Sequence, residues 1–408
     1  MLFAGKVLYW RKPTNHDMKT NLRRATLLLC GWLAAGCAPA PEVAESEYLI
    51  EGRLRNVPDS TVIRLVKEEG QLLRTIACDT VVGGRFSFRD TVGCGAPRKL
   101  LLLADGPGFP GSWLDVWVQQ GRYIEITGDD RLLPLWSVRS RVAEQRAAND
   151  FKALLRAERR QTMAWNAEQY DLFRAESEQG IDWRRIDSLR RLCRPLDSLI
   201  YLAELDHMRR APVTAVWLDK YRNYCSFLQY KRAFGHRELI RSLHARMSEA
   251  HRATEQGLEI EAYLNLPREV GVGDEMADGD LYDLQGNRRR LSEFRGKYIL
   301  LDFWSQGCAP CVRSLPETEQ IAQRYREQLE VVGICQDPER EWKRFAADNG
   351  LKGNQWNELR RGNTGLGAAY GVVGIPSYVL IAPDGKVAAM WSGYGEGSIE
   401  ARIEQLVK

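Results

Sequence analysis

Residues 298–304, YILLDFW, run directly into residues 305–311, SQGCAPC, and this junction decides the fold of the C-terminal part of the chain. A nearly continuous apolar run of this length is typical of a fully buried parallel strand. Pro310 suits the first turn of a helix, because its missing N–H has no partner there. We therefore predict a strand over 298–304, a short loop, and a helix from about Ala309 to Gln328.

The residues on both sides of this junction repeat the alternation of strands and helices. The pattern predicts further strands at 329–335, 377–382 and 386–391 and helices at 339–349 and 398–407. Pro383-Asp384-Gly385 is a strong turn signal between the last two strands. This order predicts an α/β domain with a mixed sheet over residues 271–408.

Cys308 and Cys311 form a Cys-x-x-Cys pair at the start of the predicted helix. The N–H groups and the dipole at a helix N-terminus stabilise a thiolate, which is the reactive form in disulfide exchange. We expect Cys308 to be exposed and nucleophilic, and Cys311, one turn deeper, to attack the mixed disulfide. Half of a zinc site is the other interpretation, but the chain has no second such pair and residues 271–408 contain no histidine. No metal and no cofactor are predicted.

Residues 271–408 resemble the thioredoxin fold in its exported TlpA/ResA-type branch. The matching stretches are 294–304, the Cys-x-x-Cys pair, Gly374-Ile375-Pro376-Ser377-Tyr378 and 383–385. The resemblance implies a thiol-disulfide oxidoreductase, a cis peptide bond at Ile375–Pro376, and substrate contacts at Trp304, Gly307, Ile375 and Pro376. Reduction is favoured over oxidation, because Ala309-Pro310 is close to the dipeptide of thioredoxin itself.

Asp302 lies six residues before Cys308, where thioredoxin has a buried acid. The resemblance implies a raised pKa and a role in accepting the Cys311 proton; the alternative is a polar residue satisfied structurally at a strand end. Three positions depart from the family pattern: Ser314, Gly333 and Gly307 replace an acid, a lysine and a tryptophan. They leave exchange chemistry intact and leave substrate preference and proton transfer open. We expect Cys335 to be an inert core thiol.

The first 47 residues are predicted to form an export signal followed by a tether. Residues 25–36 form an apolar segment, too short to span a bilayer, that follows Lys19, Arg23 and Arg24. Residues 33–37, LAAGC, resemble a bacterial lipobox, which implies a signal peptide over 1–36 and lipidation of Cys37. An ordinary signal peptide with a stray thiol is the alternative. Since basic residues normally lie near the start of a signal, we expect translation to begin at Met18. Ala38 favours the outer membrane.

Residues 48–131 read as a small β-sandwich. Seven short strands are predicted, and Gly83-Gly84 is a hairpin signal between two of them. The strands are expected at 48–54, 61–66, 72–78, 85–88, 100–104, 114–119 and 123–127. The segment also resembles the N-terminal β-domain of Bacteroidetes thioredoxin-like lipoproteins. Cys78 and Cys94 form either a disulfide or two buried thiols.

Residues 132–266 change to a helical period. Helices are predicted at 144–160, 162–179, 183–191, 197–209, 214–224 and 237–255, with breaks at Pro195 and Pro212. Acids are interleaved with the arginines, so solvated helix faces are favoured over nucleic-acid binding. His244 and His251 lie on one face of a predicted helix without a third ligand, which argues against a metal site.

Composition agrees with a folded, exported, multidomain protein. The chain has 408 residues, 44% hydrophobic and 27% charged. Its net charge of +4 is +5 in the first 36 residues and −1 in the rest. We predict an envelope-anchored thiol-disulfide oxidoreductase that acts on exported proteins with disulfides and is recharged by an upstream electron donor. A non-catalytic lipoprotein scaffold and, less favoured, a peroxiredoxin-like peroxidase are the alternatives. The peroxidase needs a threonine and a proline just upstream of its cysteine, and residues 304–307, WSQG, provide neither.

Overall fold

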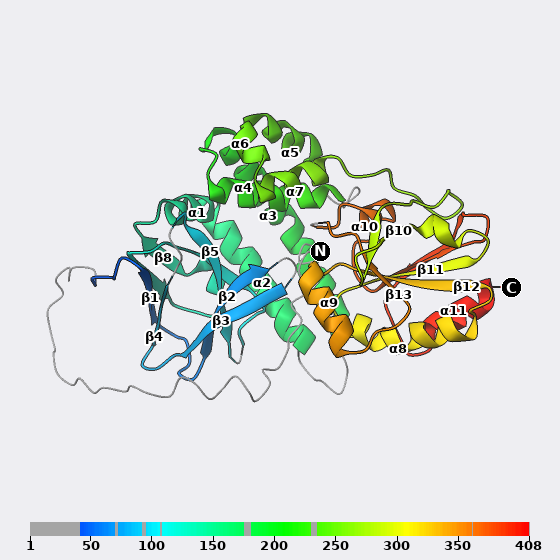
Figure 1. Ribbon diagram of the computed structural model, residues 1–408. Coiled ribbons are helices and arrows are strands. Elements are labelled where there is room, and N and C mark those ends of the chain that lie inside the picture. The colour runs from blue at the N-terminus through cyan, green and yellow to red at the C-terminus, as the bar shows by residue number, and fades with distance from the viewer. Residues whose placement is uncertain are drawn as a thin grey trace.

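The computed structural model describes residues 41–69, 72–91, 95–106, 108–174, 181–229, 235–360 and 362–407. A sheet-rich N-terminal region, a helical middle region and a thioredoxin-like C-terminal region follow one another along the chain (Figure 1). Among the described residues, no helix is long and apolar enough to cross a membrane. The predicted signal peptide, Cys37 and Cys94 lie outside the described residues.

The N-terminal region contains all the strands predicted for it and one more. They are β1 (Glu47–Leu54), β2 (Val62–Glu69), β3 (Leu72–Thr80), β4 (Arg85–Thr91), β5 (Arg98–Asp105), β6 (Trp113–Val118), β7 (Arg122–Gly128) and β8 (Ser137–Ser140). They form two four-stranded sheets, ordered β4-β1-β7-β8 and β3-β2-β5-β6. Alternate residues of both sheets, such as Ile50 and Ile63, are buried in one hydrophobic cluster. The apolar-polar alternation therefore gives the strands correctly.

One prediction for this region is confirmed locally and one is wrong. Gly83 and Gly84 make the predicted tight turn, with positive φ angles of 57° and 68°, and Val82 and Arg85 form an antiparallel bridge across it. Beyond this bridge the two strands separate into different sheets, because β4 pairs with β1 and β3 pairs with β2. β8 pairs with β7 inside the stretch predicted to be helical. Its side chain Val138 belongs to the core between the sheets, so the sheet-rich region continues to Ser140.

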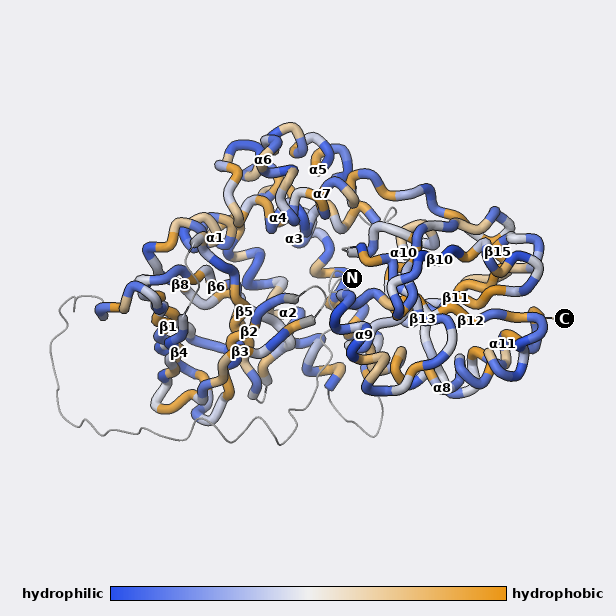
Figure 2. Tube along the Cα trace, in the orientation of Figure 1, coloured by the Kyte–Doolittle hydropathy of each residue, from blue (hydrophilic) through white to orange (hydrophobic). Residues whose placement is uncertain are grey.

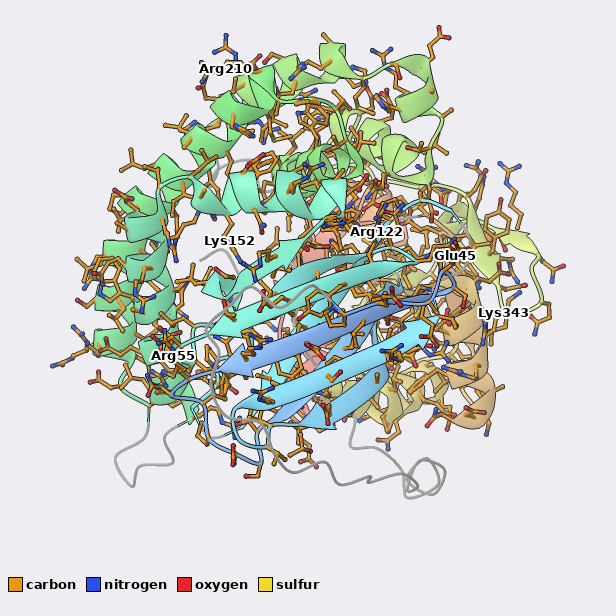
Figure 3. All side chains as sticks on the ribbon, turned by 90° about the vertical axis from the view of Figure 1, so that its left-hand side faces the viewer. Glu45, Arg55, Arg122, Lys152, Arg210 and Lys343 are labelled. Carbon is orange, nitrogen blue, oxygen red and sulfur yellow. A yellow bond between two sulfur atoms is a disulfide. The ribbon has the colours of Figure 1, made fainter. Side chains whose placement is uncertain are left out.

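The middle region packs its helices around buried aromatic side chains such as Trp217 and Tyr221. The helices are α1 (Ala143–Ala153), α2 (Arg156–Arg174), α3 (Trp183–Arg210), α4 (Ala215–Ser226), α5 (Arg237–Leu243), α6 (Glu249–Arg252) and α7 (Glu255–Leu264). Short 3-10 helices lie at η1 (Leu133–Leu135), η2 (Phe227–Gln229) and η3 (His244–Arg246). Figure 3 shows Lys152 of α1 between the helices and the sheets, where its ammonium donates to the carbonyl oxygen of Trp136.

Several helix boundaries differ from the prediction. α3 continues through Pro195. Proline has no N–H, so the carbonyl of Arg191 loses its usual helical donor. The helix tolerates this loss because Pro195 and Arg191 are both exposed to solvent. The predicted helix over 144–160 is interrupted at Leu155, whose φ is 48°. The predicted helix over 237–255 is divided among α5, η3 and α6, so His244 and His251 do not share one helix face. The imidazole of His244 instead lies 2.5 Å from the carboxylate of Glu261.

The C-terminal region is a seven-stranded mixed sheet, ordered β10-β9-β13-β12-β11-β14-β15. Its strands are β9 (Leu281–Asp283), β10 (Arg288–Arg289), β11 (Tyr298–Trp304), β12 (Leu329–Cys335), β13 (Asn354–Asn357), β14 (Ser377–Ile381) and β15 (Val387–Ser392). The helices are α8 (Ala309–Arg324), α9 (Glu339–Asp348), α10 (Leu366–Ala369) and α11 (Ser398–Leu406), and η4 (Leu291–Phe294) precedes β11.

β11 runs through the middle of this sheet, parallel to β12 and antiparallel to β14. Figure 2 shows the central strands as mostly hydrophobic. α8 and α11 cover one face through a cluster that includes Leu300, Ile321 and Ile399. α10 packs on the other face, where Tyr370 contacts Phe303. The strands and helices predicted here do not include β9, β10, β13 and α10, none of which is longer than four residues.

Candidate functional site: a dithiol at the end of the central strand

The dithiol lies where β11 ends and α8 begins (Figure 1). Cys308 is the N-cap residue of α8, and Pro310 lies in the first turn as predicted. Cys308 and Cys311 form a disulfide with an S–S distance of 2.05 Å. The backbone N–H of Cys311 donates to the Cys308 sulfur at 3.3 Å. A donor and a positive dipole end are therefore directed at this sulfur, which is what a stable thiolate requires.

Cys308 is less accessible than predicted. Only 1% of its surface is exposed in the oxidised form, and Cys311 is fully buried. The disulfide draws the Cys308 sulfur toward Cys311, and the carbonyl oxygen of Ile375 lies 3.6 Å from it. The expectation of an exposed Cys308 is wrong for this redox state. Around it, Ala309 and Gly374 are exposed, so a partner can approach over these two residues.

The loop before β14 faces the dithiol. The Ile375–Pro376 peptide bond is cis, as the resemblance implied. Pro376 is buried and Ile375 is half-buried. Proline has no N–H, so no donor from residue 376 competes for the cysteine sulfurs. Gly374, next to this peptide bond, is exposed, and the carbonyl of Ile375 lies against the Cys308 sulfur.

Asp302 lies on β11, between Gly333 of β12 and Tyr378 of β14 in the sheet register. It is 1% exposed, and neither carboxylate oxygen has a hydrogen-bond partner among the described residues. Burial raises the pKa of Asp302 to about 7. The burial expected for this residue is confirmed, and the carboxyl can exchange a proton near neutral pH.

Gly333 lies where thioredoxin has a lysine, and the side chain of Gln355 lies beside it. The Gln355 side-chain oxygen would be 2.5 Å from a Cβ at Gly333. Ser314, the other departure, is fully buried and its hydroxyl donates to the carbonyl of Cys311 at 2.7 Å. A cation and an acid at these two positions are thus replaced by neutral groups.

Trp304 cannot contact a substrate, which corrects its predicted role. Its side chain is fully buried and packs against Phe345 with ring centroids 5.6 Å apart. Trp304 is the last residue of β11 and belongs to the same buried cluster as Cys308 and Cys311. Gly307 is half-buried, and its N–H donates to the Ser305 hydroxyl.

Asp337 was not predicted, although it contacts the loop that carries Cys308. Its carboxylate accepts from the Ser305 hydroxyl at 2.6 Å and from the Gln306 N–H at 2.7 Å. Asp337 is 3% exposed, and burial raises its pKa. A signal was present: Asp337 follows the buried strand β12, and parallel strands bring their carboxyl ends to one edge of a sheet.

Of the other described cysteines, Cys335 packs in the same buried cluster as the dithiol. Cys335 is buried as expected, whereas Cys78 is exposed, so the buried-thiol alternative is wrong for Cys78. A cavity of about 270 Å³ lies between β6 and the helices, another of about 500 Å³ lies between helices of the middle region, and the dithiol lines neither of them. In the part of the chain that the structure describes, no group of three His, Cys, Asp or Glu side chains is arranged to hold a metal ion.

Comparison with known proteins covers the same part of the chain. The AhpC/TSA family matches residues 272–390. Thiol-disulfide oxidoreductase ResA of Geobacillus thermodenitrificans is 33% identical over 126 residues, which are 30% of this chain and 71% of the relative. ResA of Geobacillus kaustophilus is 31% identical over 140 residues, which are 34% of this chain and 79% of the relative.

The chain belongs to the ResA family of thiol-disulfide oxidoreductases. A solved structure of a putative thiol:disulfide interchange protein DsbE from Chlorobium tepidum is 28% identical, covers 34% of this chain and 97% of its own, and has a TM-score of 0.32. The AhpC/TSA match over residues 272–390 contains both Cys308 and Cys311. The chain is therefore a thiol-disulfide oxidoreductase, and the resemblance drawn from its sequence is confirmed.

Proposed function

We propose that this ResA-family protein reduces disulfides of exported proteins from the cell envelope. The observation that supports this most strongly is Cys308 at the N-cap of α8, with the Cys311 N–H directed at its sulfur. In the reduced protein these groups favour the Cys308 thiolate, which attacks disulfides faster than a thiol does.

The reaction has two exchange steps. The Cys308 thiolate attacks one sulfur of the substrate disulfide, forms a mixed disulfide and releases the other sulfur as a thiolate. Cys311 then loses its proton and attacks the Cys308 sulfur, which releases the second substrate thiol and leaves the Cys308–Cys311 disulfide. The substrate is reduced by two electrons and the dithiol is oxidised. An upstream dithiol protein restores the reduced form.

Asp302 is the proposed acceptor of the Cys311 proton, directly or through water. Its carboxyl titrates near neutral pH because it is buried. Ile375, Pro376 and Gly307 are the proposed substrate contacts, since the Ile375 carbonyl oxygen lies 3.6 Å from the Cys308 sulfur, Pro376 follows Ile375 and Gly307 precedes Cys308. Trp304 supports this arrangement from beneath.

Insulin reduction by the purified protein, with dithiothreitol as electron donor, tests the proposal. We expect insulin to precipitate several-fold faster than with dithiothreitol alone, and we expect no peroxide consumption. No acceleration would favour the scaffold alternative, and peroxide consumption that depends on Cys308 would favour the peroxidase.

We further propose that the protein is lipid-anchored through Cys37, on the sequence evidence of residues 33–37. Cys37→Ser should abolish incorporation of labelled lipid and move the protein from membrane fractions to the soluble fraction, because the acyl chains supply the attachment. Cys78→Ser is the matched control and should stay with the membrane. Wild-type protein that takes up no labelled lipid would contradict the anchor. Placement in the outer membrane is also proposed, and recovery of the protein in equal amounts from the inner and outer membrane fractions would contradict it.

We also propose three domains: a sandwich from residue 48, a helical domain to Leu266, and a thioredoxin-like domain that begins before the predicted residue 271. The last boundary moves because Val270 packs on the C-terminal core and its N–H donates to the Ala369 carbonyl at 2.8 Å. Residues 267–408 alone should fold and reduce insulin at a rate within about threefold of the full chain, since one sheet with its helices is large enough for its own core. An unfolded fragment, judged by circular dichroism, would show that the helical domain completes this one.

A further inference from the structure

Asp337 connects the end of β12 to the loop between β11 and the dithiol. One carboxylate oxygen accepts from the Ser305 hydroxyl at 2.6 Å. The other accepts from the Gln306 N–H at 2.7 Å and lies 3.3 Å from the Cys335 sulfur. A carboxylate with three donors around it is well satisfied in its charged form. All three residues are buried: Ser305 is 5% exposed, Asp337 is 3% exposed and Cys335 is 2% exposed.

These contacts determine how the loop presents Cys308. The Ser305 hydroxyl, while donating to Asp337, accepts from the Gly307 N–H at 3.2 Å. The Ser305 carbonyl accepts from the N–H of Cys308 at 3.0 Å. The N–H of Gln306 therefore donates to Asp337 itself. The N–H groups of Gly307 and Cys308 donate to Ser305, whose hydroxyl in turn donates to Asp337.

A second set of bonds fixes Asp337 itself. Its backbone carbonyl accepts from the Asn357 side chain at 2.9 Å, and the N–H of the preceding residue, Gln336, donates to the Trp304 carbonyl at 2.9 Å. β11, β12 and β13 all contribute to this anchorage, so the carboxylate is held by the sheet. Asp337 has no contact with the cysteine sulfurs of the disulfide in the structure.

We propose that Asp337 is a positioning residue of the dithiol, which fixes the loop over residues 305–307 through Ser305 and thereby tunes the balance between dithiol and disulfide. In the oxidised protein the disulfide also restrains this loop. In the reduced protein the disulfide restraint is absent and the Asp337 contacts remain. The inference rests on the proposed function only for its biological use, since the equilibrium between dithiol and disulfide is measured without a protein substrate.

Loss of the carboxylate should therefore favour the reduced form. Without the contacts, the loop of the reduced protein gains conformational freedom that the oxidised protein does not gain. Removal of a buried negative charge close to the site also stabilises a Cys308 thiolate. Both effects shift the equilibrium between disulfide and dithiol toward the dithiol.

The test is the equilibrium of the full chain with glutathione, in which two glutathione molecules become one glutathione disulfide as the Cys308–Cys311 disulfide is reduced. Asp337→Asn should shift this equilibrium about tenfold toward the dithiol, which corresponds to a potential about 30 mV less negative. Ser305→Ala should shift it in the same direction. In Asp337→Asn combined with Ser305→Ala, the shift should be smaller than the sum of the single shifts, because both remove one set of contacts.

Asp348→Asn, an acid-to-amide change at an exposed position of α9, is the matched control and should leave the equilibrium unchanged. If Asp337→Asn does not fold, Ser305→Ala carries the test. Single shifts below twofold, or shifts that add fully in the double variant, would overturn the proposal. Because no protein substrate is present, failure of insulin reduction by the wild-type protein would refute the proposed function without affecting this result.

Discussion

Cys311→Ser is expected to capture substrate proteins as mixed disulfides on Cys308, whereas Cys308→Ser captures none and loses insulin reduction by about a thousandfold or more. The asymmetry follows from the geometry. The Cys311 N–H and the start of α8 stabilise a thiolate at Cys308, and Cys311 is fully buried. Without Cys311 the first attack still takes place, but no thiol remains to resolve the mixed disulfide.

Non-reducing electrophoresis followed by mass spectrometry measures the captured partners. Cys193→Ser, which removes a buried thiol of α3, is the control and should behave like the wild-type protein. In the reduced wild-type protein, alkylation at mildly acidic pH should label Cys308 before Cys311. If Cys311 reacted first, or if Cys308→Ser were the better trap, the assigned roles of the two thiols would be wrong.

Asp302→Leu is expected to increase the stability of the C-terminal region by up to about 4 kcal/mol above pH 7, while slowing turnover. Burial raises the pKa of Asp302 from 3.8 to about 7. Between these two values the folded protein holds a proton that the unfolded chain has released, so the wild-type stability falls as pH rises from about 4 to 7 and then levels off. Leucine has a similar size and carries no charge to desolvate.

Hydrogen exchange of the β11 amides in the full chain, corrected for the intrinsic rate at each pH, measures this effect at pH 5 and pH 8. The gain from Asp302→Leu should be clearly larger at pH 8. Asp348→Leu, at an exposed position, should show no such pH dependence. If Asp302→Leu increased the stability by the same amount at pH 5 and pH 8, Asp302 would not be desolvated as its burial implies. Unchanged insulin reduction by Asp302→Leu would remove it from the second exchange step.

The positions of the two cysteines in the C-terminal region could be predicted from the sequence because the strand and the helix around them have strong local signals. The apolar run of β11 and the proline in the first turn of α8 are local features, and they place Cys308 and Cys311 without knowledge of the rest. The seven strands predicted for the N-terminal region alternate clearly for the same reason.

The errors concern features that depend on neighbours in space. β8 is recognisable only once β7 is beside it, and β13 reads Asn-Gln-Trp-Asn, which has no strong strand pattern. Continuation of α3 through Pro195 depends on which face of the helix meets solvent. The burial of Cys308 and of Trp304 depends on how the disulfide and the Ile375 loop close over the strand end. Asp337 lies 29 residues after Cys308 in the sequence, and pairing of β12 with β11 brings it to the site.

The reduction potential of the Cys308/Cys311 pair, measured in the full chain against glutathione or dithiothreitol redox buffers, tests the central claim most directly. A protein that reduces disulfides should have a potential close to that of thioredoxin, about −270 mV. A potential near about −120 mV, which is typical of a strong periplasmic oxidant, would contradict the reducing function. A pair that does not interconvert between dithiol and disulfide in any of these buffers would contradict the catalytic role itself.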